Sequence, residues 1–494
     1  MKDSNFIKLL RKCSKSEVKA FRDYVFSPFF NKNEKVRRLC DLVLEYAPDF
    51  EHSDLNKQNL FPKLFENRPY DRLPINNVIS DLYQLFLDFL AFREMSERPQ
   101  RLFDFQMKAL LKKDATQLAE QRASRFHQIQ MNSKKRDFEF FQYEYARFEN
   151  LDELFLTHQK RGYDENLQLK NDAFDVFYFI NKLRIACDMA SRNVVLNANY
   201  ECRFLEVFFE EYRHFLEVEN LSDNLKLSDK NGDWSNLPAL KIYVNTLQML
   251  ESEDADIYYF ELKKLLETHF EIFPKAELTG IYSYLLNFCI KKINFGKSDF
   301  YPEILELYKL LLKRELIFKN EYLTQWTFRN IVTAGIRSNE SDWAEKFILE
   351  YENRLLPEER NNAVSYNLAT VYFAKKDYRA ALQTLQNVAF TDNFYQTGAK
   401  TIQLKSYFEL EEEEAFYSLV SAFLKYLRRH RQMSDYHKEL NVNFVKSAKE
   451  IFRLKTSERV VSTKIFQKKS EEIRQKLLIQ KTIAERDWLE SVLS

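Results

Sequence analysis

Glycine and proline are scarce in this chain of 494 residues, which contains 6 glycines and 10 prolines. Glycine usually makes up about 7% of a protein and proline about 5%. Folds built from strands and tight hairpins need many glycines, because their turns contain residues with positive φ. The shortage therefore predicts an all-α protein and argues against β-rich and doubly wound folds.

Sequence motifs that bind phosphate groups or metals are missing as well. The two closest glycines are Gly280 and Gly296, whereas P-loops and dinucleotide fingerprints need glycines two to five residues apart. The 7 histidines never have the i, i+4 spacing of a helical zinc site, and no two of the 5 cysteines lie two to four residues apart. No nucleophile elbow is present. We therefore expect no metal, no cofactor and no catalytic activity.

The chain also lacks long apolar runs and an excess of one charge. No run approaches the ~18–20 apolar residues that cross a bilayer, and charges interrupt the opening stretch MKDSNFIKLLRKC. Lys and Arg number 75 against 74 Asp and Glu, so the overall charge identifies no partner. An odd number of widely spaced cysteines fits reduced thiols. We expect a cytoplasmic protein that does not contact membranes.

Helix signals are abundant at the start of the chain. Most prolines fall within residues 1–99, which predicts short helices joined by sharp corners. Ser14 and Glu17 have the spacing of a capping box that opens a helix toward Phe26. A long helix from Pro74 carries a broad apolar face, so it fits a buried helix better than one that reads a DNA groove. We predict a helical domain over 1–99.

The rest of the chain divides at its helix breakers. Residues 100–218 contain no proline and predict long helices, whereas the polar stretch 219–236 predicts an internal loop or a domain boundary. The segment from Asp229 resembles the start of a calcium loop, but Trp234 and Leu240 stand where that loop needs glycine and glutamate. Repeated helix pairs are predicted over 237–433. C-terminal helices that cap the stack of helix pairs are predicted over 434–494, where Trp488, Leu489 and Val492 are expected to dock the last helix.

A repeated unit is clearest in residues 361–388, NNAVSYNLATVYFAKKDYRAALQTLQNV. The residues that carry its signature are Leu368, Ala369, Tyr372, Asp377, Tyr378, Ala381, Leu385 and Val388. Trp343 precedes Tyr378 by 35 residues, and Tyr407 follows Tyr372 by 35. The pattern resembles the tetratricopeptide repeat, whose period is about 34 residues. The whole chain also resembles a bacterial type of protein in which a helical domain precedes such repeats, and that resemblance implies no activity.

The resemblance to tetratricopeptide repeats implies an α-solenoid, in which helix pairs stack into a right-handed superhelix and expose a concave surface. A peptide or partner helix is expected to bind on that surface. The implied inward positions are Tyr366, Thr370, Phe373, Thr401, Lys405 and Phe408. Packing between neighbouring repeats explains the same aromatic residues equally well. The leading hypothesis is a non-catalytic scaffold for protein–protein interaction.

Two charged segments allow other interpretations. Residues 421–481 contain 16 Lys or Arg and 6 Asp or Glu, which fits either a solvated helix face or an RNA- or DNA-binding stripe. The residues expected to contact phosphates in that alternative are Arg428, Arg429, Arg431, Lys446, Lys449 and Arg453. The acidic run 409–414 fits either an exposed turn or an acidic docking patch.

Overall fold

The computed structural model describes residues 1, 4–157, 162–196, 198–205, 207, 209–210, 237–252, 255–386, 393–429, 433–457 and 463–493. Among these residues, 22 α-helices account for 79% of the structure and no β-strand occurs. The predicted all-α class is therefore confirmed. Residues 219–236, where a loop was predicted, lie outside the described residues, as do Asp229 and Trp234 of the calcium-like segment. No helix in the described part is both long and apolar enough to cross a bilayer.

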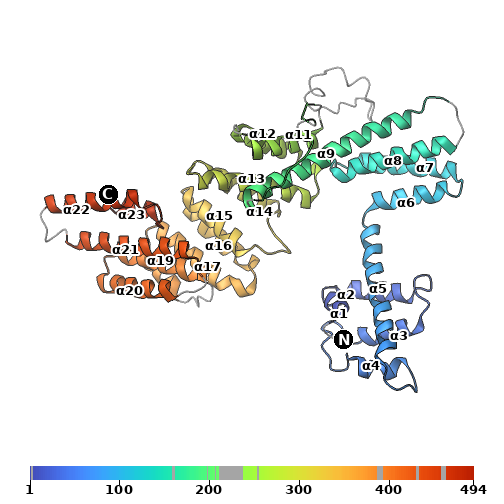
Figure 1. The fold of residues 1–494 in the computed structure, drawn as a ribbon, viewed down its shortest axis with the longest axis horizontal. Helices are drawn as coiled ribbons and strands as arrows, with labels where there is room; N and C mark the ends of the chain where they lie inside the picture. Colours follow the sequence, from blue (N-terminus) through green and yellow to red (C-terminus); the bar gives the residue numbers. More distant parts are fainter. Residues whose placement is uncertain are drawn as a thin grey trace. The chain divides into compact units, whose positions relative to one another are not determined.

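The chain divides into two compact units (Figure 1). The first unit contains Met1–Val244 and Leu265–Phe273, and the second contains Asn245–Lys264 and Pro274–Ser494. Two helices, α11 (Pro238–Glu251) and α12 (Ala255–His269), contribute residues to both units. This division is coarser than the four segments predicted from the sequence.

The first unit begins with a helical domain and continues in longer helices. Its helices are α1 (Asn5–Leu10), α2 (Lys15–Phe26), α3 (Glu34–Leu44), α4 (Lys57–Leu64), α5 (Arg72–Ser96), α6 (Pro99–Leu111), α7 (Thr116–Asn132), α8 (Phe138–Thr157), α9 (Glu165–Leu196) and the short 3₁₀ helix η3 (Phe270–Ile272). One hydrophobic core extends from α1 to α5, and a second one joins α6, α7 and α8.

Local capping explains where the early helices begin. The Ser14 hydroxyl accepts a hydrogen bond from the Glu17 amide, and the Glu17 carboxylate accepts one from the Ser14 amide at 2.7 Å. The predicted capping box of α2 is therefore confirmed. Helix α5 begins two residues before Pro74, because the Asp71 carboxylate accepts a hydrogen bond from the Leu73 amide at 2.9 Å. Its apolar face is buried as predicted, through Ile75, Val78, Leu82, Phe86 and Phe89.

The second unit continues as a series of neighbouring helices. They are α13 (Lys275–Asn294), α14 (Phe300–Lys313), α15 (Gln325–Arg337), α16 (Ser341–Tyr351), the 3₁₀ helix η4 (Glu352–Arg354), α17 (Pro357–Ala374), α18 (Tyr378–Gln386), α19 (Asn393–Glu409), α20 (Glu413–Arg429), α21 (Asp435–Ser457), α22 (Thr463–Ile479) and α23 (Arg486–Leu493). Consecutive helices from α13 to α22 pack on one another, and α17 also contacts both α15 and α19.

Small residues allow the helices of this unit to approach closely. In the segment with the repeat signature, α17 and α18 pack together, and Ala369 and Ala381 are completely buried. The turn between them is closed by a hydrogen bond from the Asp377 amide to the Tyr372 carbonyl at 2.9 Å. A Cβ on Gly335 of α15 would lie 3.0 Å from the Cβ of Ala344 in α16. The pair of helices predicted over 361–388 is therefore present up to Gln386, and Val388 lies outside the described residues.

Three helices follow residue 434 in the described part of the chain. Helices α21 and α22 are long and α23 is short. Leu489 and Val492 of α23 are buried in a core that contains residues of α19, α20, α21 and α22. The expected docking of the last helix is therefore confirmed.

Candidate functional site

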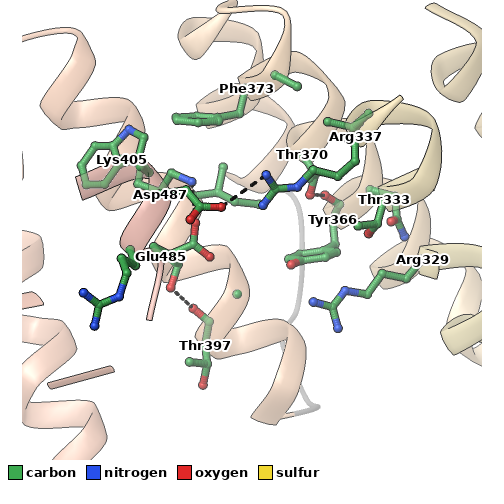
Figure 2. A pocket seen from close by; sticks show the side chains of 18 of the residues that line it. Arg329, Thr333, Arg337, Tyr366, Thr370, Phe373, Thr397, Lys405, Glu485 and Asp487 are labelled. Carbon is green, nitrogen blue, oxygen red and sulfur yellow. Dashed lines mark hydrogen bonds and ion pairs between the residues drawn. The ribbon is translucent and has the colours of Figure 1, made fainter. Parts of the chain in front are cut away.

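A cavity of about 1070 Å³ lies within the second unit (Figure 2). Helices α15, α17 and α19 form one side of it, and residues of α21 and of the segment 485–491 form the other. On each of the first three helices, residues spaced by three to four positions face the cavity, because that spacing places side chains on one side of a helix. These residues are Arg329, Thr333 and Arg337 of α15, Tyr366, Thr370 and Phe373 of α17, and Thr397, Thr401 and Lys405 of α19.

The structure brings together five of the six residues expected to bind a partner. These are Tyr366, Thr370, Phe373, Thr401 and Lys405, and all five line the cavity. The Thr370 hydroxyl donates to the Tyr366 carbonyl at 2.9 Å, and the Thr401 hydroxyl donates to the Thr397 carbonyl at 3.1 Å. Both hydroxyl oxygens keep acceptor capacity for a ligand.

Phe408 is placed differently from this expectation. Its side chain is 3% exposed and is not among the residues that line the cavity. Its ring packs edge-on against Phe416, Phe452 and Trp488, with centroids 5.9, 5.3 and 5.0 Å away. Burial of a large ring is favourable, so Phe408 belongs to the hydrophobic core near the end of α19.

Tyr366 forms the floor of the cavity. Its ring lies edge-on to Tyr395 with centroids 5.2 Å apart, and the Arg329 guanidinium lies 5.9 Å from the ring centroid. Gly398 of α19 approaches the ring so closely that a Cβ there would lie 2.7 Å from Tyr366 Cε2. Burial raises the pKa of the Tyr366 hydroxyl, which therefore stays protonated at neutral pH.

The Lys405 ammonium group contacts one carboxylate and two aromatic rings. Its Nζ lies 2.7 Å from Glu485 Oε2, 4.5 Å from the centroid of the Phe373 ring and 5.5 Å from that of Trp488. The side chain of Lys405 is 12% exposed and that of Glu485 is 39% exposed, so the lysine is buried while its partner reaches solvent. This charge-assisted contact links α19 to the residue that precedes α23.

The segment before and within α23 is firmly attached. The Arg486 guanidinium donates hydrogen bonds to the carbonyls of Leu477 and Gln480. The Trp488 indole nitrogen donates to Glu409 Oε1 at 2.8 Å, and the Ala484 amide donates to the Leu440 carbonyl at 3.2 Å. These contacts make α23 a fixed wall of the cavity.

A second ion pair joins α15 to α23 at the cavity. Arg337 Nη1 lies 3.6 Å from Asp487 Oδ2, and the two side chains are 53% and 80% exposed. Figure 2 shows the Arg337 side chain extending toward Asp487, with Tyr366 and Thr370 beside it. Compared with the pair of Lys405 and Glu485, this contact is long and open to solvent.

Sequence reasoning missed two sides of this site. Arg329 and Thr333 precede Tyr366 and Thr370 by 37 residues each, close to the repeat period, so extending the spacing one unit upstream would have found them. Nothing in the spacing points to Glu485 or Asp487. Those two reach the cavity through the long-range packing of α23.

The basic residues of the nucleic-acid alternative are spread along two helices. Arg428 and Arg429 are exposed at the end of α20, whereas Lys446, Lys449 and Arg453 are exposed along α21, and Arg431 lies outside the described residues. Tyr417 of α20 contacts Phe452 of α21, with ring centroids 5.8 Å apart. Arg428 comes eleven residues after Tyr417, about 16 Å along the helix axis. The arginines of α20 therefore lie far from Arg453.

The acidic run between α19 and α20 is an exposed turn. Residues 411–414 are exposed, and Glu411 has a φ of 55°. Glu413 and Glu414 occupy the first turn of α20, where negative charge is favourable. In the described part of the chain, no group of three or more His, Cys, Asp or Glu side chains is arranged to hold a metal ion.

Comparison with known proteins gives little similarity. No protein-family model matches the chain, and no solved structure matches it. The chain is similar to homeodomain-interacting protein kinase 4 of Mus musculus and Rattus norvegicus, with 28% identity, and of Macaca fascicularis, with 29% identity. Each match covers 136 residues, which are 28% of this chain and 21% of the kinase.

This similarity does not place the chain in the kinase family. The chain spans about a fifth of the length of the curated relatives it matches. The glycine-rich loop of protein kinases has glycines two and three residues apart, whereas the closest glycines here are Gly280 and Gly296. The match therefore brings no phosphate-binding loop with it.

Proposed function

We propose that this protein is a non-catalytic interaction scaffold that binds a peptide or partner helix in the cavity lined by α15, α17 and α19. The observation that supports this proposal is that five of the residues expected to line a binding groove line one cavity of about 1070 Å³. Ligand sites are typically clefts of ~300–1,000 Å³ with apolar walls and a few polar groups. The rings of Tyr366, Phe373 and Trp488 supply the walls, and threonines and charged residues supply the polar groups.

We further propose that the helix pairs of the second unit form a right-handed α-solenoid of tetratricopeptide-like repeats. Support comes from the 35-residue spacing of the signature, from the buried Ala369 and Ala381, and from the packing of α17 against both α15 and α19. Stacked helix pairs need such contacts between their first helices. The five cysteines are widely separated and none forms a disulfide, which fits the cytoplasmic location expected from the sequence.

A groove-filling substitution tests the scaffold function. Peptides that bind the full-length chain are first selected from a displayed library of random peptides. Thr370→Trp adds an indole at the half-buried centre of the cavity, so the selected peptides are expected to bind it at least about tenfold more weakly by fluorescence anisotropy. Leu349→Trp on α16 is the control, because Leu349 is 58% exposed and does not line the cavity.

Two results would contradict the scaffold function. One is that no peptide is enriched over the empty support. The other is that the selected peptides bind the Thr370→Trp and Leu349→Trp variants equally well.

Nucleic-acid binding by the basic segment remains a second proposal. The observation in its favour is that Lys446, Lys449 and Arg453 are exposed at i, i+3 and i+7 of α21 and so follow one side of the helix. If these three residues contact phosphates of single-stranded RNA, raising the salt from about 50 to about 200 mM should weaken binding roughly 20-fold. Reversing all three charges to glutamate should abolish binding. RNA binding that persists in this variant would contradict the proposal.

A further inference from the structure

Two arginines of α15 face the cavity. Arg329 and Arg337 are eight residues apart, which places them about 12 Å apart along the helix axis. Thr333 lies between them on the same helix. In Figure 2 the Arg329 side chain extends toward Tyr366 and the Arg337 side chain toward Asp487. One wall of the cavity is therefore positively charged along its length.

The other charged residues of the cavity differ in how they are held. Arg486 donates to two backbone carbonyls, and the buried side chain of Lys405 pairs with Glu485 at 2.7 Å. Both are fixed parts of the wall. Two acidic residues line the cavity: Glu485 directly precedes α23, and Asp487 lies in its first turn. The two cations of α15 are Arg329, which lies 5.9 Å from the centroid of the Tyr366 ring, and Arg337, which pairs with Asp487.

Asp487 already supplies a carboxylate to one of these arginines. Its distance of 3.6 Å from Arg337 and its exposure of 80% contrast with the 2.7 Å contact between Glu485 and Lys405. Exposed ion pairs contribute little to stability, so a carboxylate from another molecule can replace Asp487 without disturbing the fold. Trp488 and the buried Leu489 hold α23 in place whether or not Asp487 is paired.

We propose that the cavity recognises an acidic segment of a partner protein, whose carboxylates bind Arg329 and Arg337, and that Asp487 occupies the Arg337 end of this site in the free protein. This inference rests on the proposed scaffold function and names the chemistry of the partner. In an extended peptide, side chains four residues apart are separated by about 13 Å, which matches the spacing of the two arginines.

The fixed carboxylate of Glu485 favours a peptide over a nucleic acid as the occupant. Every phosphate of a nucleic-acid strand is charged, so a strand crossing the cavity would bring like charge against Glu485. A peptide can place an uncharged residue at that point. It also offers side chains that pack on the rings of Tyr366 and Phe373.

The test uses the full-length chain and two fluorescein-labelled probes, (Gly-Glu)6 and (Gly-Gln)6, in anisotropy titrations at about 50 mM salt. The glutamate probe is expected to bind and the glutamine probe is not. Arg337→Gln should weaken binding of the glutamate probe by about fivefold to tenfold, and Asp487→Asn should strengthen it by about threefold to fivefold. Arg379→Gln on α18 is the matched control, because this exposed arginine does not line the cavity and its replacement changes the charge equally.

Several results would overturn this inference. The first is that the glutamate probe does not bind. The second is that Arg337→Gln and Arg379→Gln weaken its binding equally. The third is that the Asp487→Asn variant binds the probe no more tightly than the wild type does. Displacement of the probe by oligo-uridine with the same dependence on Arg337 would assign the site to nucleic acid instead. If library peptides of neutral composition still bind in a manner that depends on Thr370, the scaffold function survives while the acidic partner is rejected.

Discussion

Replacing Arg147 with methionine is expected to lower the free energy of unfolding of the first unit by about 3–5 kcal/mol. Arg147 and Glu144 lie one turn apart on α8 and are 8% and 4% exposed. The guanidinium donates two hydrogen bonds to the carboxylate, with distances of 3.3 Å from Nε and 3.0 Å from Nη2. Without Arg147 the Glu144 carboxylate would remain buried with its main counter-charge removed. Removing one partner of a buried pair is far more costly than removing both.

The pH dependence of this variant provides an independent readout. Burial alone would raise the pKa of the Glu144 carboxyl, but the contact from His127 and the charge of Arg147 hold that pKa below its ordinary value. In the wild type this carboxylate therefore contributes stability above its unfolded pKa, and the contribution is lost as the pH falls through the folded pKa. Without Arg147 the pKa of the Glu144 carboxyl in the folded protein rises. Protonation of that carboxyl then removes the cost of burying its charge. The difference in the free energy of unfolding between the variant and the wild type should be largest near pH 7 and should become smaller in acid.

Hydrogen exchange of peptides from α8 measures this effect within the first unit. Arg38→Met is the control, because Arg38 and Glu66 pair at 3.2 Å with side chains 55% and 74% exposed. Loss of such an exposed pair should cost less than about 1 kcal/mol. Changing both Glu144 and Arg147 to methionine should restore most of the lost stability. Equal protection of α8 in the Arg147→Met variant and the wild type would show that this ion pair does not stabilise the unit.

Gly398→Ala is expected to destabilise the second unit by about 1–3 kcal/mol, although alanine normally favours a helix over glycine by up to about 1 kcal/mol. A Cβ at this position would lie 2.7 Å from Cε2 and 2.8 Å from the hydroxyl oxygen of Tyr366. The ring has little room to move, because Tyr366 is 7% exposed and packs on Tyr395. Because Tyr366 also forms the cavity floor, the same change should weaken binding of the selected peptides.

Gly280→Ala is the matched control for this substitution. Gly280 lies inside α13, and a Cβ there would meet nothing within 4 Å. The Gly280→Ala substitution should therefore raise the free energy of unfolding by about 0.5–1 kcal/mol. Urea unfolding followed by circular dichroism measures both variants. In a Tyr366→Leu background the penalty of Gly398→Ala should largely disappear, and a penalty of unchanged size would locate the strain elsewhere.

Helix boundaries in this protein follow largely from residues that are close in sequence. The Ser14 and Glu17 box starts α2 where the sequence placed it, and α17 ends and α18 begins around the turn before Tyr378. Helix α9 begins where the Asp164 carboxylate accepts a hydrogen bond from the Asn166 amide, and it is long because no proline follows until Pro238. These signals act within one turn of a helix.

The candidate site was predictable only on the helices that carry the repeat signature. The resemblance to tetratricopeptide repeats implied that Tyr366, Thr370 and Phe373 face inward from α17, and all three line the cavity. The same resemblance implied an inward position for Phe408 of α19, which packs into the core instead. Periodicity identifies a helix face, but the neighbouring helices decide whether that face meets a cavity or a core.

The sequence by itself determined the all-α class and the groups that face one side of each helix, because backbone hydrogen bonding and the 3.6-residue period are local properties. Only the tertiary structure decided that α23 forms a wall of the cavity. Lys405 meets Glu485 across 80 residues of sequence, and Arg337 meets Asp487 across a still longer separation. Such contacts depend on how separate helices pack around a shared core, and no spacing along the chain encodes them.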